Sequence, residues 1–547
     1  MAKAGFAGRL TALLRRFRSN SSGNIAVIFA MALLPILSAI GCATDYSLAS
    51  RMKAKMQSAA DAAAVASISQ NSAGWVAASS MTGNGSVAAG VTDATDIFNG
   101  NLNAITGYGN LSVTPTVTKT GAALNSVVTF SATVPVVFMK VLGYTSLTIN
   151  GTSQASSSLP LYLDFYMTLD VSGSMGLPST SSEASRMQSI NPDNYVQYPT
   201  GCTLACHFAP QNSACTDSGT QQYPTNNYCM GYVYSRLSQS GLSSLLTQAS
   251  SRSVPKANVP GLPTAMLTGT GVLNAVDGSA NPLVTGNSSS LSYSLAAATS
   301  CPTAGTDGCI QLRLDAVGVA LTDLFATASS AQYELVTNEF RIGLYPFITS
   351  LYSYFPLTTA INGSVTNSTT INYAANNLAT LLDTNMNSNL GSGGTHIDVA
   401  LNSINSLITS VGTGATSTST LPYVFLITDG AQDPQSKGVP NGGWSGSNHA
   451  TVLSDPSNAY PAACTTLKNR GIIVAVLYIP YQTISPVNAS FANDEDDAAN
   501  NNIPNIPPSL LACASSGFFY TANTPADITN MLQTMFKQAL ATAHITN

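Results

Sequence analysis

An uncharged, apolar stretch near the amino terminus constrains this chain more than any other feature. It covers the 20 residues 25–44, IAVIFAMALLPILSAIGCAT. As an α-helix rising about 1.5 Å per residue, it spans about 30 Å, the thickness of one bilayer hydrocarbon core. A cleaved signal peptide has a shorter apolar region, of about 7–15 residues. Pro35 is compatible with a membrane-spanning helix, because local adjustments satisfy the carbonyl group that it frees. We therefore expect one uncleaved span at about residues 25–44.

The charges around this stretch predict its orientation. Residues 1–55 carry a net charge of +7 and the rest of the chain carries −12. Five of the basic residues precede the stretch and three follow it: Lys3, Arg9, Arg15, Arg16 and Arg18, then Arg51, Lys53 and Lys55. The positive-inside rule places Met1 in the cytoplasm and the residues after Asp45 in the periplasm. We expect a single-pass inner (plasma) membrane protein. Two alternatives stay open, a cleaved signal peptide and lipoprotein processing at Cys42.

The composition excludes two broad classes of protein. Only 8% of the 547 residues are charged, against roughly 25% in typical soluble proteins, while 44% are hydrophobic. The chain can therefore bury sizeable cores, and its length allows two to four domains. A cytosolic housekeeping enzyme would carry a denser surface charge, and a nucleic-acid binder would be basic. We expect an exported protein that binds no nucleic acid.

The cysteines agree with export. Besides Cys42 there are eight: Cys202, Cys206, Cys215, Cys229, Cys301, Cys309, Cys464 and Cys513. An even number in an exported region favours disulfides, and the short loop between Cys301 and Cys309 suggests one pair. Cys202 and Cys206 with His207 leave a zinc cluster as the alternative. The connectivity of the six cysteines between 202 and 309 does not follow from the sequence.

The residue patterns divide the chain into three parts. In residues 1–70, a basic tail and the apolar stretch lead into an Ala-rich helical stripe that ends near Ser69, so one long helix is expected. In residues 71–158, a Gly- and Ser-rich loop with a short helix precedes alternating Val- and Thr-rich stretches at about 110–157. These stretches predict a small β-meander that would form a stalk.

From Leu159 to the end, strand and helix patterns alternate. The strands LYLDFYMTLD, FRIGLYPFI, YVFLITD and GIIVAVLYIP are almost continuously apolar, and amphipathic helices are expected at 312–328, 395–410 and about 525–543. This alternation predicts an α/β fold with a doubly wound, mostly parallel sheet. A cysteine-containing insertion at about 176–311 separates the first strand from its helix.

Oxygen-bearing side chains follow two of these strands and begin one helix. Asp170, Ser172 and Ser174 follow the first strand, Asp429 ends YVFLITD, and Thr395 follows Gly391-Ser392-Gly393-Gly394. Because the carboxyl ends of parallel strands share one sheet edge, the three loops are expected to converge. Two carboxylates and neutral hydroxyls suit a hard cation, Mg²⁺ first, with Mn²⁺ or Ca²⁺ as alternatives.

This D-x-S-x-S, T, D pattern is similar to the metal-ion-dependent adhesion site (MIDAS) of the von Willebrand factor A domain, and the resemblance covers residues 159–547. It implies that Asp170, Ser172 and Ser174 bind the metal and that Thr395 and Asp429 complete the site. It also implies that an acidic residue of a partner fills the open coordination position. The 176–311 insertion is the largest departure from that family.

The amino-terminal region resembles the TadG-like proteins of the tight-adherence (Flp) pilus system. The resemblance rests on Gly23 and Ala26, on Asp45-Tyr46 and on the run DAAAVA at 61–66. Members commonly join this segment to a carboxyl-terminal von Willebrand A domain. The resemblance also implies that Cys464 and Cys513 are paired. No glutamate stands at the fifth position after Gly23, so cleavage by a prepilin peptidase is not expected.

The sequence thus predicts a membrane-anchored, non-enzymatic protein of pilus assembly or adhesion. Its partners would be pilus-assembly components or a surface ligand that offers a carboxylate. The alternative is a free cell-surface or secreted adhesin that is not tied to a pilus. An enzyme is not expected, because the site lacks a general base and a nucleophile motif.

Overall fold

The computed structural model describes residues 23–190, 235–236, 238–240, 272–274, 294–296, 298–330, 332–383, 388–437, 444–446, 449–453, 462–483 and 493–545. The chain divides into two compact units, residues 1–159 and 160–547. The cysteines at 202, 206, 215 and 229, with His207, lie outside the described residues. For these positions the choice between disulfides and a zinc cluster therefore stays open.

The first unit begins with one long helix, α2 (Gly23–Ala66), as predicted. Within the described residues it is the one helix that is long and apolar enough to cross a membrane, with a mean hydropathy of 2.2 over its most apolar window. Among its described side chains in residues 25–40 the large apolar ones are exposed, from 38% at Leu33 to 74% at Ile25. The fold itself thus leaves these apolar side chains largely uncovered by protein.

From Ala49 onward, α2 packs on an antiparallel sheet of order β1-β2-β3-β4. The strands are β1 (Gly85–Ser86), β2 (Gly109–Thr120), β3 (Ala123–Pro135) and β4 (Ser146–Ser158), which confirms the β-meander. The helix α2 contacts β3, β4 and α4 (Ala88–Leu102). Every second residue of β3 is buried, because successive side chains of a strand point to opposite faces. The α2 helix and the meander therefore share one core.

The region between α2 and β2 differs from the prediction. Instead of a loop with one short helix, it holds α3 (Ala73–Ser79) and the 15-residue α4. Ala94, Phe98 and Leu102 of α4 are buried against the core shared by α2 and β3. This packing stabilises a helix whose Gly and Asn content gives it weak intrinsic propensity.

The second unit is built on a six-stranded sheet of order β16-β15-β10-β5-β8-β9. All neighbouring strands are parallel except the pair β8 and β9. The strands are β5 (Leu163–Asp170), β8 (Phe340–Phe347), β9 (Phe355–Thr358), β10 (Leu421–Thr428), β15 (Ile473–Tyr478) and β16 (Phe519–Thr521). The predicted doubly wound, mostly parallel fold is confirmed. In chain order the strands run 3-2-1-4-5-6, so the order reverses between β5 and β10, where such folds bind ligands.

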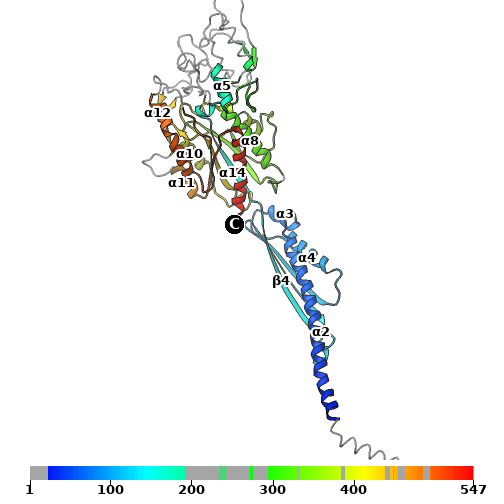
Figure 1. Cartoon of the computed structure of the whole chain (residues 1–547). Coiled ribbons are helices and arrows are strands. Elements are labelled where there is room, and N and C mark those ends of the chain that lie inside the picture. The colour runs from blue at the N-terminus through cyan, green and yellow to red at the C-terminus, as the bar shows by residue number, and fades with distance from the viewer. Residues whose placement is uncertain are drawn as a thin grey trace, which may run out of the picture. The chain divides into compact units, whose positions relative to one another are not determined.

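Helices cover both faces of this sheet (Figure 1). Alternate side chains such as Tyr166 and Val424 pack with α10 (Ile397–Leu407), α11 (Ala462–Asn469) and α13 (Ile506–Cys513). On the other face, α8 (Arg313–Ala328) lies beside α14 (Pro525–Ile545), and the rings of Phe165 and Phe536 are 5.5 Å apart. The four central strands, β8, β5, β10 and β15, are therefore almost fully buried.

Shorter elements complete the second unit. They are η2 (Gly173–Gly176), α5 (Ser181–Ile190), β6 (Val272–Asn274), β7 (Ser294–Ala296), α9 (Ile371–Asn376), η6 (Leu378–Leu381), β11 (Ala431–Gln432), β12 (Ser436–Lys437), β13 (Trp444–Ser445), β14 (Thr451–Val452), α12 (Asn493–Asn502) and η7 (Ile503–Asn505).

The inserted segment leaves and re-enters the domain at one point. Pro178 and Leu312 form a β-bridge, and the Ser179 N–H donates to the Gln311 carbonyl at 2.9 Å. Within the insertion, Arg236 forms a buried ion pair with Asp315 of α8 at 2.8 Å. These contacts thus hold the two ends of the insertion next to each other, so that the rest of the domain folds as it would with a short loop there.

Two disulfides lie in the described residues, Cys301–Cys309 and Cys464–Cys513, and both pairings were predicted. The second joins α11 to α13 across a sequence separation of 49 residues. Cys42 is a free, half-buried cysteine on α2.

Candidate metal centre

Asp170 is the last residue of β5, and three hydrogen bonds fix its buried carboxylate. The Ser172 N–H and hydroxyl donate to Oδ1 at 3.0 and 2.6 Å. The Thr428 hydroxyl, from the neighbouring strand β10, donates to Oδ2 at 2.6 Å. The Ser174 hydroxyl lies 3.4 Å from that of Ser172. Burial raises the pKa of Asp170, although these hydrogen bonds oppose the rise.

Asp429 follows β10 directly and is fully buried. Neither of its carboxylate oxygens has a hydrogen-bond partner among the described residues. Burial and the nearby Asp170 raise the pKa of Asp429 to about 7, while the Ser174 hydroxyl and the Arg313 guanidinium act in the opposite direction. Two buried carboxylates thus lie together at the point where the strand order reverses. Asp429 accepts no hydrogen bond of ordinary geometry from the described residues, although the Ser174 hydroxyl and the Ala431 N–H lie near enough to lower its pKa.

The loop that carries Thr395 is tied to both neighbouring loops. The Thr395 N–H donates to the Asp433 carbonyl, and the Asp433 N–H donates to the Thr395 carbonyl, each at 3.0 Å. Asp383 makes the second connection, because its N–H donates to the Val171 carbonyl at 3.1 Å. Its carboxylate accepts from the Ser392 hydroxyl at 2.7 Å and the Gly393 N–H at 2.8 Å. The Thr395 loop is therefore held against the Asp170 loop and the loop after β10.

Two glycines allow these loops to approach one another. At Gly394 a Cβ atom would overlap the carbonyl oxygen of Gln435, so the two backbones fit only without a side chain. Gly430, directly after Asp429, has φ +80°, a conformation that glycine adopts readily. A side chain at Gly394 would push the two loops apart, whereas one at Gly430 would strain the backbone and overlap Ile506.

Arg313, the first residue of α8, brings a positive charge toward the two carboxylates. It is 5% exposed, and its Nη2 donates to the Pro480 carbonyl at 3.0 Å. Its Nη1 has no hydrogen-bond partner among the described residues. Burial lowers the pKa of Arg313 and Asp429 opposes that shift. The guanidinium therefore provides part of the charge that balances the carboxylates.

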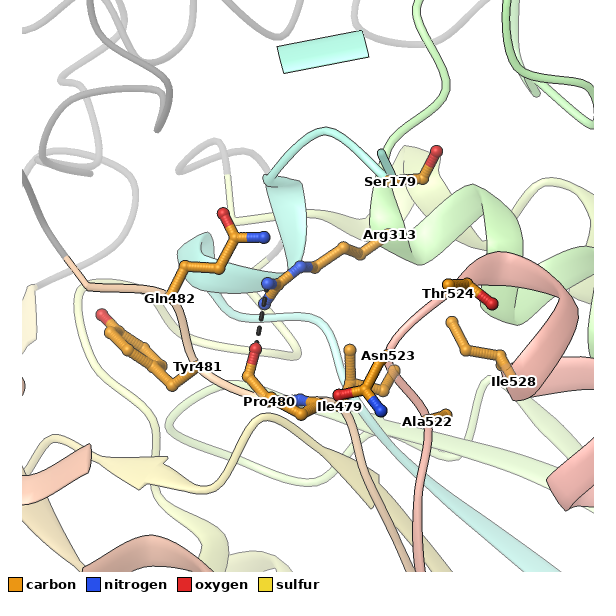
Figure 2. Close-up of a pocket in the computed structure, with 10 residues that line it drawn as sticks. All are labelled: Ser179, Arg313, Ile479, Pro480, Tyr481, Gln482, Ala522, Asn523, Thr524 and Ile528. Carbon is orange, nitrogen blue, oxygen red and sulfur yellow. Dashed lines mark hydrogen bonds between the residues drawn. The ribbon is translucent and has the colours of Figure 1, made fainter. Parts of the chain in front are cut away.

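Figure 2 shows the pocket of about 150 Å³ that Arg313 lines at the carboxyl edge of the sheet. Pro480 and Asn523 contribute from the segments after β15 and β16, and Ser179 lies across the pocket from Gln482. The lining combines polar and apolar groups around the buried guanidinium of Arg313.

The structure brings Asp170, Ser172, Ser174 and Asp429 together, and it holds the Thr395 loop beside them. Sequence reasoning missed three supporting residues. Thr428 directly precedes Asp429, so strand pairing could have placed it next to Asp170. Asp383 and Arg313 belong to no motif, and tertiary folding alone places them here.

The donor set fits a hard divalent cation. It consists of two carboxylates and neutral hydroxyls, and no cluster of three or more His, Cys, Asp or Glu exists within the described ranges. Such oxygen ligands suit Mg²⁺ better than zinc or copper. An unpartnered buried carboxylate is costly unless a cation or a proton neutralises it.

Comparison with protein families identifies the amino-terminal segment. Residues 23–74 match the family model described as "Putative Flp pilus-assembly TadE/G-like". This segment is TadE/G-like. The match covers the exposed apolar part of α2, the rest of α2, which packs on the antiparallel sheet, and the start of α3. No curated protein matches the chain.

Solved structures share only general similarity with this chain. The pilus adhesin SpaC of Lactobacillus rhamnosus GG is 11% identical, with a TM-score of 0.29 over 79% of this chain and 34% of SpaC. The PilB minor pilin of Streptococcus sanguinis is 11% identical, with a TM-score of 0.26 over 79% of this chain and 78% of PilB. The vWF domain of the type V pili tip protein Mfa5 of Porphyromonas gingivalis is 15% identical, with a TM-score of 0.23 over 43% and 89%. The chain thus spans about a third of SpaC.

Proposed function

We propose that this chain is a membrane-anchored, non-enzymatic protein of tight-adherence pilus assembly or adhesion. Its second unit would bind an acidic protein partner through one divalent cation, Mg²⁺ in the first place. The ligands would be Asp170, Ser172, Ser174, Thr395 and Asp429. The observation that carries the proposal is the buried, unpartnered carboxylate of Asp429 beside Asp170 at the reversal of strand order.

The charge balance of the site explains why a cation would bind and remain reactive. Two adjacent buried carboxylates repel each other when both are ionised, and a divalent cation removes that repulsion. The remaining proposed ligands, Ser172, Ser174 and Thr395, are neutral. A cation held mostly by neutral oxygens keeps positive charge available for a carboxylate of the partner.

Hydrogen bonding supports a binding role rather than a hydrolytic one. The Ser172 hydroxyl donates to Asp170, a carboxylate that Thr428 also holds, and not to an imidazole base. A serine nucleophile needs an adjacent general base that accepts its proton. The match of residues 23–74 to a pilus-assembly family agrees with a non-enzymatic function.

The exposed apolar part of α2 supports anchoring by a single span at about residues 25–44, with the amino terminus in the cytoplasm. Alkaline phosphatase fused after residue 547 would test the orientation. We expect active fusion protein that fractionates with the inner membrane. Recovery of the protein in the medium or on the outer surface would instead support the free adhesin.

Crosslinking in intact cells tests the partner. We expect a crosslinked protein that disappears when a chelator is added or when Asp170→Asn replaces the wild type. The matched control is Asp323→Asn, the same chemical change at an exposed position of α8. An identical crosslinked product in all four samples would contradict binding through a cation.

A further inference from the structure

Large apolar side chains are concentrated in the turn that joins β3 to β4. We call residues 136–145 the β3–β4 turn. Its exposed apolar side chains are Val137, Phe138, Val141, Leu142 and Tyr144, at 67, 51, 82, 55 and 55% exposure. Scattered exposed apolar residues are ordinary, but a contiguous patch of this kind marks a surface that contacts something apolar.

Two contacts hold the β3–β4 turn against α2. The buried carboxylate of Asp45 accepts hydrogen bonds from the N–H groups of Val137, Phe138 and Met139, at 3.0, 2.9 and 2.8 Å. Phe138 also packs on Gly41, where an added Cβ would lie only 2.5 Å from the Phe138 Cβ. The turn is therefore fixed to the helical turn between Gly41 and Asp45.

This helical turn lies at the outer end of the apolar stretch. Ile36, Leu37 and Ile40 are 52, 54 and 59% exposed, whereas Asp45 is buried within the first unit. Gly41 and Asp45 are about 6 Å apart along the helix axis. The β3–β4 turn therefore contacts α2 over a single helical turn. In the proposed topology the level of this helical turn would be the boundary between a 20-residue span and the aqueous phase.

The chemistry of the turn is that of a membrane interface. Tyr144 and Lys140 are exposed within the turn, and Tyr46 of α2 is 69% exposed beside it. Tyrosine rings are enriched at the headgroup level, and lysine side chains reach from apolar surroundings to the water. An apolar patch edged by these residues suits the boundary between headgroups and acyl chains.

We propose that the β3–β4 turn enters the outer surface of the same phospholipid bilayer that α2 spans. The first unit would then be attached at two adjacent places, the helix and the turn. Two attachments restrict tilting of the unit against the bilayer surface, which a single helix would permit. This inference rests on the proposed membrane anchor.

Quenching of tryptophan fluorescence by brominated lipid tests the inference on the full-length protein. The protein is placed in nanodiscs of phosphatidylethanolamine and phosphatidylglycerol, one chain per disc, so that no second copy can cover the turn. Val141→Trp reports on the turn and Ile36→Trp on the span. Thr120→Trp is the control, since it is exposed at the opposite end of the sheet, about 40 Å of strand away. The wild-type protein gives the background fluorescence of Trp75 and Trp444, which is subtracted from the signal of each variant.

We expect brominated acyl chains to remove about half of the added fluorescence at Val141→Trp and at Ile36→Trp, and to leave Thr120→Trp almost unchanged. Quenching at Ile36→Trp without quenching at Val141→Trp would overturn the inference and leave the anchor intact. Quenching at neither position would overturn both. Absence of quenching at Val141→Trp with one chain per disc, together with a blue-shifted Val141→Trp emission only with two chains per disc, would assign the patch to a second copy and overturn the inference.

Discussion

Replacing Asp429 by asparagine should stabilise the metal-free protein at alkaline pH, although it removes a proposed metal ligand. Burial and the nearby Asp170 raise the pKa of Asp429 from its ordinary 3.8 to about 7. The carboxyl group therefore stays protonated in the folded state at pH values where the unfolded chain has already released the proton. Between these values the folded state binds more protons, so its stability falls as the pH rises.

The magnitude follows from the pKa. A tenfold change in proton affinity corresponds to about 1.36 kcal/mol, so the rise from 3.8 to about 7 costs on the order of 4 kcal/mol of stability above pH 7. An asparagine side chain at this position would avoid the cost because it does not ionise. This figure already includes the attraction between Asp429 and Arg313, which lowers the pKa of Asp429.

Thermal unfolding of the detergent-solubilised full-length chain in chelator, from pH 4.5 to 8.5, measures this difference. We expect the wild-type Tm to fall with rising pH, and the Tm of Asp429→Asn to exceed it by about 5 to 10 °C at pH 8. Glu339, whose pKa burial raises to about 8, titrates in both proteins, so the difference reports on the pair of Asp429 and Asp170. If Asp429→Asn has the lower Tm at pH 8, or if both proteins show the same pH dependence, the reasoning is wrong.

Three further predictions follow from the contacts around the site. Asp383→Ala should weaken Mg²⁺ binding at least tenfold, as measured by calorimetry, because it frees the Thr395 loop without removing a proposed ligand; unchanged affinity would show that this tie is dispensable. Arg313→Gln should tighten Mg²⁺ binding about tenfold in the same assay, since it removes a cationic neighbour of Asp429, whereas Arg313→Lys should not. Paired replacement of Cys464 and Cys513 by alanine should lower the unfolding free energy by about 2–4 kcal/mol in thermal melts, and an unaltered Tm would argue against a stabilising cross-link between α11 and α13.

The sheet and its order of elements could be predicted because each element carries its own periodicity. The strand ending at Asp170 and the strand ending at Thr428 are almost continuously apolar, which is typical of parallel strands buried on both faces. The antiparallel edge strand β9 was missed because it has only four residues, three of them half-buried. The helix α4 was underestimated because its stability comes from packing Phe98 and Ala94 into the shared core.

Part of the candidate site could likewise be predicted from the sequence, and part could not. Asp170, Ser172, Ser174 and Asp429 follow strands, so local sequence and strand order predict their meeting. Asp383 lies in a loop without a motif, and its hydrogen bonds to Ser392 and Gly393 arise only from the folded backbone. The charge of Arg313 is likewise visible in the sequence, whereas its position near Asp429 depends on how α8 docks on the sheet.

Isothermal titration of the full-length protein with Mg²⁺ tests the central claim most directly. Wild type, Asp170→Asn and the exposed control Asp323→Asn are titrated at pH 8, where Asp429 is largely ionised. The account predicts one Mg²⁺ per chain for wild type and control, and a loss of at least tenfold in affinity for Asp170→Asn. Equal binding by all three proteins, or no binding by the wild type, would contradict it.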